Sequence, residues 1–112
     1  MKAYTDLEQS KKLAEILPLE SADMVWVLAN PDLPMIKAIA YEDSEKSKYY
    51  EVQPAWSFAA LLNILPNYQL QTQEDGIGIL CSCNGKFNIV TADNPINACC
   101  EMILKLHESN LL

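Results

Sequence analysis

Four cysteines and a single histidine are the residues whose types best suit chemistry at a site. The cysteines form two local pairs, Cys81-x-Cys83 and Cys99-Cys100, and the histidine is His107. Four thiolates make a soft tetrahedral set for zinc, and a cysteine beside a histidine suits nucleophilic catalysis. Structural zinc sites, however, favour C-x₂₋₄-C spacings, and adjacent cysteines on a helix diverge by about 100°. The spacing therefore favours buried, reduced thiols, and we expect no metal ligands.

Thiol redox and thiol catalysis meet a similar objection. Thioredoxin-like chemistry places C-x-x-C at a helix N-terminus, whereas Cys99 is expected one turn into its helix. Cys100 and His107 are two helical turns apart, about 10 Å of rise, which is too far for a hydrogen bond. By helical angle His107 falls within the apolar stripe, near the helix C-terminus where its charged form is favourable. A small-ligand or thiol-dependent enzymatic site around Cys81, Cys83 and His107 stays open as an alternative, because strand and helix can meet in space.

The carboxylates form no recognisable catalytic pair. Glu42-Asp43 and Glu74-Asp75 are adjacent, but both lie in predicted turns. The sequence contains no P-loop, G-x-G-x-x-G, G-x-S-x-G or H-E-x-x-H motif. We therefore expect no catalytic residue and no cofactor, and the missing motifs argue against an enzyme while the thiol-dependent alternative stays open.

The charge balance bears on the class of partner. Fifteen acidic residues stand against eight basic ones, and all eight are lysines, for a net charge of −7. Nucleic-acid binding needs a basic face, so we expect no nucleic-acid partner. An acidic mimic of nucleic acid that inhibits a basic partner is a second alternative, and it needs acids at regular spacing on one face.

No apolar run approaches about 18 residues and the start lacks a signal-type apolar region, so we expect no membrane contact and a cytoplasmic location.

Capping and turn signals predict the elements of the N-terminal half. Thr5-x-x-Glu8 resembles a capping box, so a helix is expected to begin near Asp6, and Pro18 stops it. Short apolar runs then predict strands, at Met24–Leu28, Ile36–Glu42 and Tyr49–Val52. Residues 58–65 are apolar except for Asn63 and predict a buried, central core helix closed by Pro66.

The C-terminal half predicts a β-meander followed by a helix. Three strands are expected, at Tyr68–Thr72, Ile77–Cys83 and Lys86–Thr91. Asn84-Gly85 is a strong hairpin signal, and a two-residue loop sets Cys83 opposite Lys86 and Leu80 opposite Ile89. The face with Leu80, Phe87 and Ile89 is expected to pack on helices, whereas the face with Ile79, Cys81 and Val90 is mixed.

The last helix has the clearest signals. Asn94 is a typical N-cap and Pro95 occupies the first helical position. One apolar stripe runs along the helix, through Ile96, Cys99, Cys100, Ile103 and Leu106. Altogether we expect a single α+β domain over residues 1–112, with three helices packed on a small, mostly antiparallel sheet and a C-terminal β-meander and helix.

Several motifs resemble those of a family of short uncharacterised proteins from gut bacterial genomes and their phages or mobile elements. The similar segments cover nearly the whole chain outside 30–53, and include Ala22-Asp23-Met24, Pro54-x-Trp56-Ser57 and Asn94-Pro95-x-x-Ala98-Cys99. The resemblance implies an intracellular bacterial accessory protein. It implies no activity and no site residue.

These observations favour a non-catalytic protein-interaction module with a protein partner. Such a module should present flat surfaces and inert thiols, whereas an enzyme should show a closed pocket with a reactive thiol. Tyrosines beside an acidic, polar loop suit an interface, and the candidate residues are Tyr41, Glu42, Asp43, Glu45, Tyr49 and Tyr50. A homodimer is a further possibility if the sheet face with Ile79, Cys81 and Val90 is uncovered.

Overall fold

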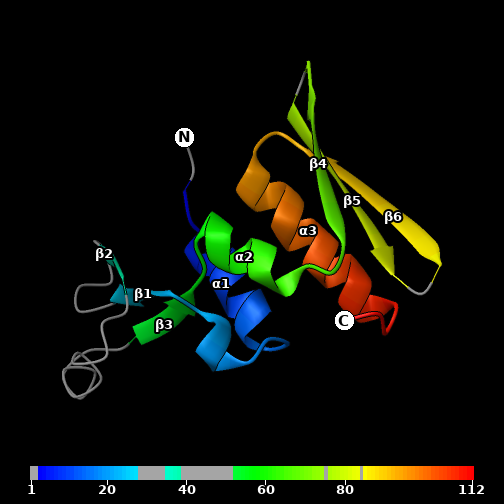
Figure 1. Cartoon of the computed structure of the whole chain (residues 1–112). Helices are drawn as coiled ribbons and strands as arrows, with labels where there is room; N and C mark the ends of the chain where they lie inside the picture. Colours follow the sequence, from blue (N-terminus) through cyan, green and yellow to red (C-terminus); the bar gives the residue numbers. More distant parts are fainter. Residues whose placement is uncertain (1–2, 28–34, 39–51, 75, 84) are drawn as a thin grey trace.

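Helices separate two small antiparallel sheets in the computed structural model, which describes residues 3–27, 35–38, 52–74, 76–83 and 85–112 (Figure 1). The helices are α1 (Leu7–Ala14), α2 (Phe58–Ile64) and α3 (Pro95–Glu108), with a short 3₁₀ turn at Leu19–Ser21. The first sheet has the order β2-β1-β3, from β1 (Met24–Val27), β2 (Met35–Ala38) and β3 (Val52–Ala55). The second has the order β4-β5-β6, from β4 (Tyr68–Gln73), β5 (Gly76–Cys83) and β6 (Lys86–Ala92). The α+β class is thus confirmed, with the strands divided between two sheets.

The first helix is capped by a different pair of residues from the predicted one. Asp6 is the N-cap, and its Oδ1 accepts a hydrogen bond of 2.8 Å from the backbone N–H of Gln9. Gln9 returns the contact through its Oε1, which accepts from the backbone N–H of Asp6. The capping box is therefore Asp6–Gln9, one residue later than Thr5–Glu8. Thr5 is instead fully buried, and its hydroxyl forms a hydrogen bond of 2.7 Å with the Ser10 hydroxyl.

Polar contacts join the N-terminal segment to the first sheet and to α2. The Thr5 hydroxyl accepts a hydrogen bond from the backbone N–H of Trp56, which follows β3. The Trp26 indole donates to the Thr5 carbonyl at 3.0 Å, and the Trp56 indole donates to the Ser21 hydroxyl at 3.0 Å. The Trp56 backbone N–H and the two indole N–H groups thus each have a hydrogen-bond partner.

β1 is the central strand of the first sheet. Met24 pairs with Ala38 of β2 and with Ala55 of β3. Pro54 lies opposite Val25, in a strand that forms the edge of the described sheet, where the missing N–H is tolerated. The third strand was predicted at Tyr49–Val52 and is observed at Val52–Ala55, in residues expected to lead into the helix.

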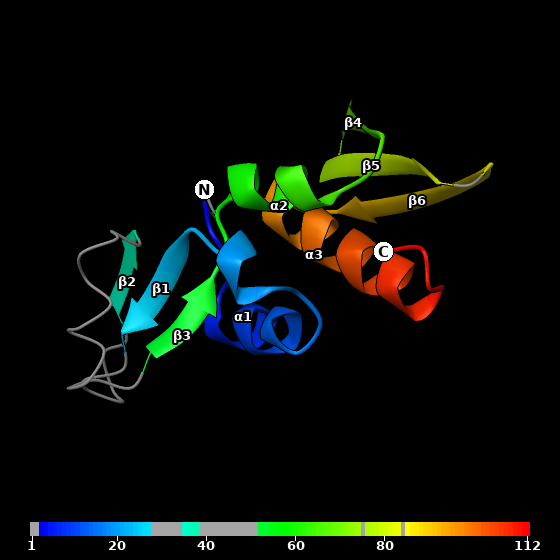
Figure 2. The same cartoon turned by 60° about the horizontal axis from the view of Figure 1, so that its bottom comes forward.

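The central core helix is α3, and the prediction that the segment at 58–65 takes this place was wrong. In α2 only Ala60 and Leu61 are buried. The apolar residues of α3 are buried from one end to the other, at Ile96, Ala98, Cys99, Cys100, Met102, Ile103 and Leu106. Asn94 caps α3, and its side chain accepts from the Asn97 N–H at 2.9 Å, as predicted. Figure 2 shows α3 lying along one face of the β4–β5–β6 sheet.

The predicted meander and its register are confirmed. Cys83 pairs with Lys86, Ser82 with Phe87 and Leu80 with Ile89. The prediction of which face meets the helices was wrong, because Ile79 and Cys81 are fully buried whereas Phe87 is 70% and Ile89 63% exposed. A homodimer was predicted if the face with Ile79, Cys81 and Val90 were uncovered. This face instead packs against the core.

The first residue of β5, Gly76, must be glycine. A Cβ there would lie 2.1 Å from the carbonyl oxygen of Ala92, and the backbone φ is +155°. We expect Gly76→Ala to lower the free energy of unfolding by about 2 kcal/mol or more, because strand β6 must shift. Urea unfolding measures the loss. Gly85→Ala is the matched control, since its Cβ meets nothing within 4 Å and its φ of +77° costs only about 1 kcal/mol. An equal loss in both variants would contradict this account.

Candidate binding surface

The structure brings three of the four cysteines together in the core. Cys81 on β5 is fully buried, as is Cys99 on α3, and Cys100 is 2% exposed. Burial is the largest cause that raises the pKa of the Cys99 thiol from 9.0 to about 12, and the neighbouring Cys100 and Cys81 contribute to the same rise. A thiol with so high a pKa stays protonated at neutral pH and is a poor nucleophile.

The remaining members of the alternative thiol site do not complete it. His107 lies in the last turn of α3 and is exposed, so its predicted place within the buried stripe was wrong. Cys83 ends β5, and its side chain lies outside the described residues. Within the described part of the chain, no group of three or more His, Cys, Asp or Glu side chains is placed to hold a metal ion. The geometry therefore lends no support to a thiol or metal centre here.

The outer face of the second sheet is the most distinctive surface of the described residues. We use this term for the face that lies away from α3, which carries the side chains of Asn67, Gln69, Gln71, Leu80, Ser82, Phe87, Ile89 and Thr91, with Gly78 between Gln71 and Thr91. Their common face follows from the register, which sets Gln69 opposite Leu80 and Leu80 opposite Ile89. The backbone beneath them is held by ladder pairing on both sides of β5, so the side chains stand on a rigid support.

Apolar and amide side chains divide the outer face. Phe87 and Ile89 project from β6, and they are among the most exposed large apolar side chains described. Gln69 and Gln71 project from β4 on the same face, across β5 from Phe87 and Ile89. Apolar area left in water on a rigid sheet is typical of a protein-binding surface, since its burial is favourable at about 25 cal/mol per Å².

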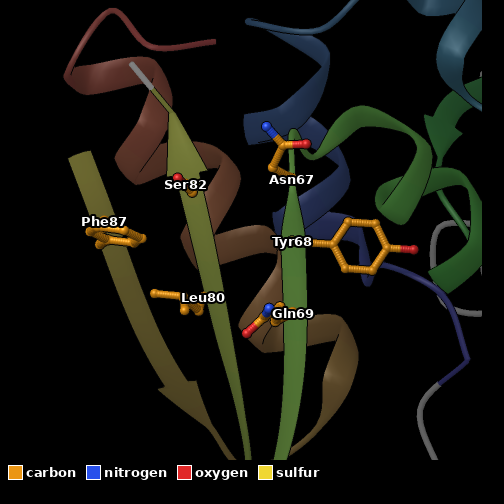
Figure 3. Close-up of a pocket in the computed structure, with 6 residues that line it drawn as sticks. All are labelled: Asn67, Tyr68, Gln69, Leu80, Ser82 and Phe87. Atoms are coloured by element: carbon orange, nitrogen blue, oxygen red, sulfur yellow. The ribbon is translucent and has the colours of Figure 1, made fainter. Parts of the chain in front are cut away.

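A hollow of about 360 Å³ lies on this sheet beside Phe87 (Figure 3). Its lining consists of Asn67, Tyr68, Gln69, Leu80, Ser82 and Phe87. Figure 3 shows Leu80 and Phe87 on neighbouring strands, with Ser82 and Asn67 toward one end. Among the described residues that line the hollow there is no cysteine, histidine or carboxylate. It can therefore accept an apolar side chain but offers no group for acid–base or nucleophilic catalysis.

Of the two edge strands of the sheet, β4 and β6, the second carries a blocking contact. Lys105 of α3 reaches around β6, and its Nζ donates a hydrogen bond of 3.4 Å to the carbonyl oxygen of Ile89. A lysine at an edge strand discourages the addition of another strand. The contact favours binding through the side chains of the outer face over binding through its edge.

The structure does not describe the surface predicted from tyrosines and acids. Its residues fall outside the described part of the chain, in the sequence between β2 and β3, and are Tyr41, Glu42, Asp43, Glu45, Tyr49 and Tyr50.

On α3 the exposed stripe has Glu101 and Glu108 with Lys105 between them. This alternation of sign breaks the regular acidic spacing that mimicry of nucleic acid needs.

One signal in the sequence pointed to the outer face. Along β5, the residues Ile77, Ile79 and Cys81 are uniformly apolar, whereas Gly78 and Ser82 flank Leu80 on the other side. The central strand of a sheet is buried on its apolar side, so β5 decides which face meets the helix. Judged from β6 alone, Phe87 and Ile89 gave the opposite answer.

None of the described helices has the length and apolar character needed to cross a membrane. Comparison with protein-family models, with curated proteins and with solved structures gives no match to this chain.

Proposed function

We propose that this protein is a non-catalytic protein-binding domain and that the outer face of its second sheet is a binding surface. The observation that carries the proposal is the exposure of Phe87 and Ile89, at 70% and 63%, on a rigid three-stranded sheet. Fully burying one such side chain is worth about 1.5–3 kcal/mol. Aromatic side chains that enter a partner's pocket are frequent hot spots of interfaces.

The composition of the outer face suits an uncharged partner surface. Among the described residues of this face none is ionisable, although the chain carries 23 ionisable acidic and lysine side chains in all. Apolar side chains on β6 supply the contact area, and amides on β4 supply hydrogen bonds that orient the partner. Three buried thiols and a hollow free of catalytic groups fit a binding role better than an enzymatic one.

Site-specific photo-crosslinking in the source cells tests the proposal. A photoreactive phenylalanine analogue replaces Phe87, and the same analogue replaces Leu19 as the control. Leu19 is 60% exposed and lies in the 3₁₀ turn, away from the second sheet. We expect protein adducts from position 87 and none above background from position 19. Adding Ile89→Lys should abolish the adducts at 87, because an ammonium group would be desolvated in the contact.

The outcomes separate clearly. Discrete protein adducts at position 87 that Ile89→Lys removes would support the outer face as a binding surface. Equal labelling at positions 19 and 87, or no adduct at 87, would overturn the proposal. The thermal unfolding midpoint of each variant shows that its fold is intact.

A further inference from the structure

The outer face carries both a protruding side chain and a hollow that can receive it. We infer that its occupant is a second copy of this chain, bound face to face about a two-fold axis. In such a dimer, Phe87 of each copy enters the hollow beside Phe87 of the other. The inference rests on the proposed function, because it names the partner of the same surface.

Self-complementary shape is the first argument. A two-fold interface requires that if one residue contacts a second, the second also contacts the first. Phe87 is 70% exposed and stands at the rim of the hollow lined by Gln69, Leu80 and Ser82. The knob and the hole therefore belong to the same face of the same molecule, which is the arrangement that an isologous contact needs.

Charge is the second argument. Each copy has a net charge of −7, so two copies repel one another over most approaches. The described side chains of the outer face carry no charge, and two such faces meet without desolvating an ion. A basic partner would instead be drawn to the acidic remainder of the surface. The two cases predict opposite effects of salt, because screening relieves repulsion between copies and weakens attraction to a basic partner.

Area sets the expected strength. Three strands about 4.8 Å apart, each contributing about five residues with a rise of 3.4 Å, give the outer face a projected area of a few hundred Å². A standard stable interface buries about 800 Å² on each partner. The outer face alone therefore predicts a weak dimer, with a dissociation constant of about 10 µM or weaker. Measurements must reach concentrations of about 1 mM to populate it.

Sedimentation equilibrium of the whole chain at rising concentration measures the association. We expect the wild type to shift from 12.6 kDa toward twice that mass, and the shift to strengthen when salt is raised. Phe87→Ala removes the knob, and Ser82→Arg fills the hollow. Each variant alone should lower the association constant by about tenfold or more. Lys86→Ala is the control, because Lys86 is exposed but lies on the opposite face, and its association should match that of the wild type.

Mixing the two variants tests the knob-and-hole arrangement itself. Phe87→Ala keeps the other five residues that line the hollow, and Ser82→Arg keeps the knob, so a mixed pair regains one of the two contacts. The equimolar mixture should therefore associate more tightly than either variant alone. Circular dichroism confirms that both variants are folded.

Three results would overturn the inference. They are a wild type that stays at 12.6 kDa up to about 1 mM, a dimer that Phe87→Ala leaves unchanged, and a mixture no tighter than its components. The first of these, together with adducts of position 87 to a different protein, would leave the proposed binding surface standing and reject the second copy. Absence of any adduct at position 87, both in the cells and with the purified protein at about 1 mM, would reject both.

Discussion

Ile79→Ala should lower the free energy of unfolding by about 2–5 kcal/mol, whereas Ile89→Ala should lower it by less than about 1 kcal/mol. The two residues have the same side chain and lie on neighbouring strands of one sheet. Ile79 is fully buried against α3, and Ile89 is 63% exposed on the outer face. Truncation at Ile79 leaves a cavity in the core, but truncation at Ile89 removes methyl groups that water already surrounds. A domain is stable by only about 5–15 kcal/mol in total, so the first loss is large.

Chemical denaturation of the two variants gives both values. The slope of the unfolding free energy against denaturant should stay constant, which shows that the denatured state is unchanged. Equal losses, or a larger loss at Ile89, would mean that the outer face is buried in the isolated protein. The proposed binding surface would then be wrong.

Cys99 should react with an alkylating reagent at least about 1000-fold more slowly in the native protein than in denaturant, and Cys81 and Cys100 should also react slowly because they are buried. Cys81, Cys99 and Cys100 are buried, and the pKa of Cys99 is raised from 9.0 to about 12. A rise of three pKa units alone lowers the thiolate fraction at neutral pH by about 1000-fold. Labelling is followed by mass spectrometry in the Cys83→Ser variant, so that the signal reports only these three thiols.

A fast-reacting thiol among the three would contradict the account of buried, unreactive cysteines and would support the thiol-dependent alternative.

A second measurement follows from the raised pKa of Cys99. The unfolded chain loses this proton above pH 9 while the folded chain retains it to about pH 12, so stability falls as pH rises through this range. Cys99→Ala lacks this titration. Its unfolding free energy should therefore fall less steeply with pH above 9 than that of the wild type.

Local signals predicted much of the fold. The Asn94 cap with Pro95 predicted the start of α3, and Asn84-Gly85 predicted the register between Ser82 and Phe87. These signals act over a few residues, so the sequence alone is enough to interpret them. The capping box of α1 was misplaced by one residue, because the Thr5 hydroxyl turns inward to Ser10 and Asp6 takes the cap.

Long-range packing explains what local patterns missed. Both faces of the second sheet carry large apolar residues, and β6 alone favours the wrong one. The face that meets α3 is decided by β5, where Gly78 and Ser82 leave the outer side poorly filled. Likewise, the helix at 58–65 appeared central because it is apolar on nearly every side, but the longer α3 contacts both β5 and β6 and occupies the centre. His107 is exposed although its neighbour Leu106 is fully buried, so α3 presents a different side to the core there than the helical angle indicated.

The central claim is that the outer face of the second sheet binds protein, and a photo-crosslinking scan along β6 tests it most directly. Lys86 and Phe87 are neighbours in sequence and both exposed, but their side chains lie on opposite faces of the sheet. A photoreactive residue is placed in turn at positions 86, 87 and 89. The account predicts protein adducts at 87 and 89 and none at 86. Adducts at 86 alone, or equal adducts at all three positions, would contradict it.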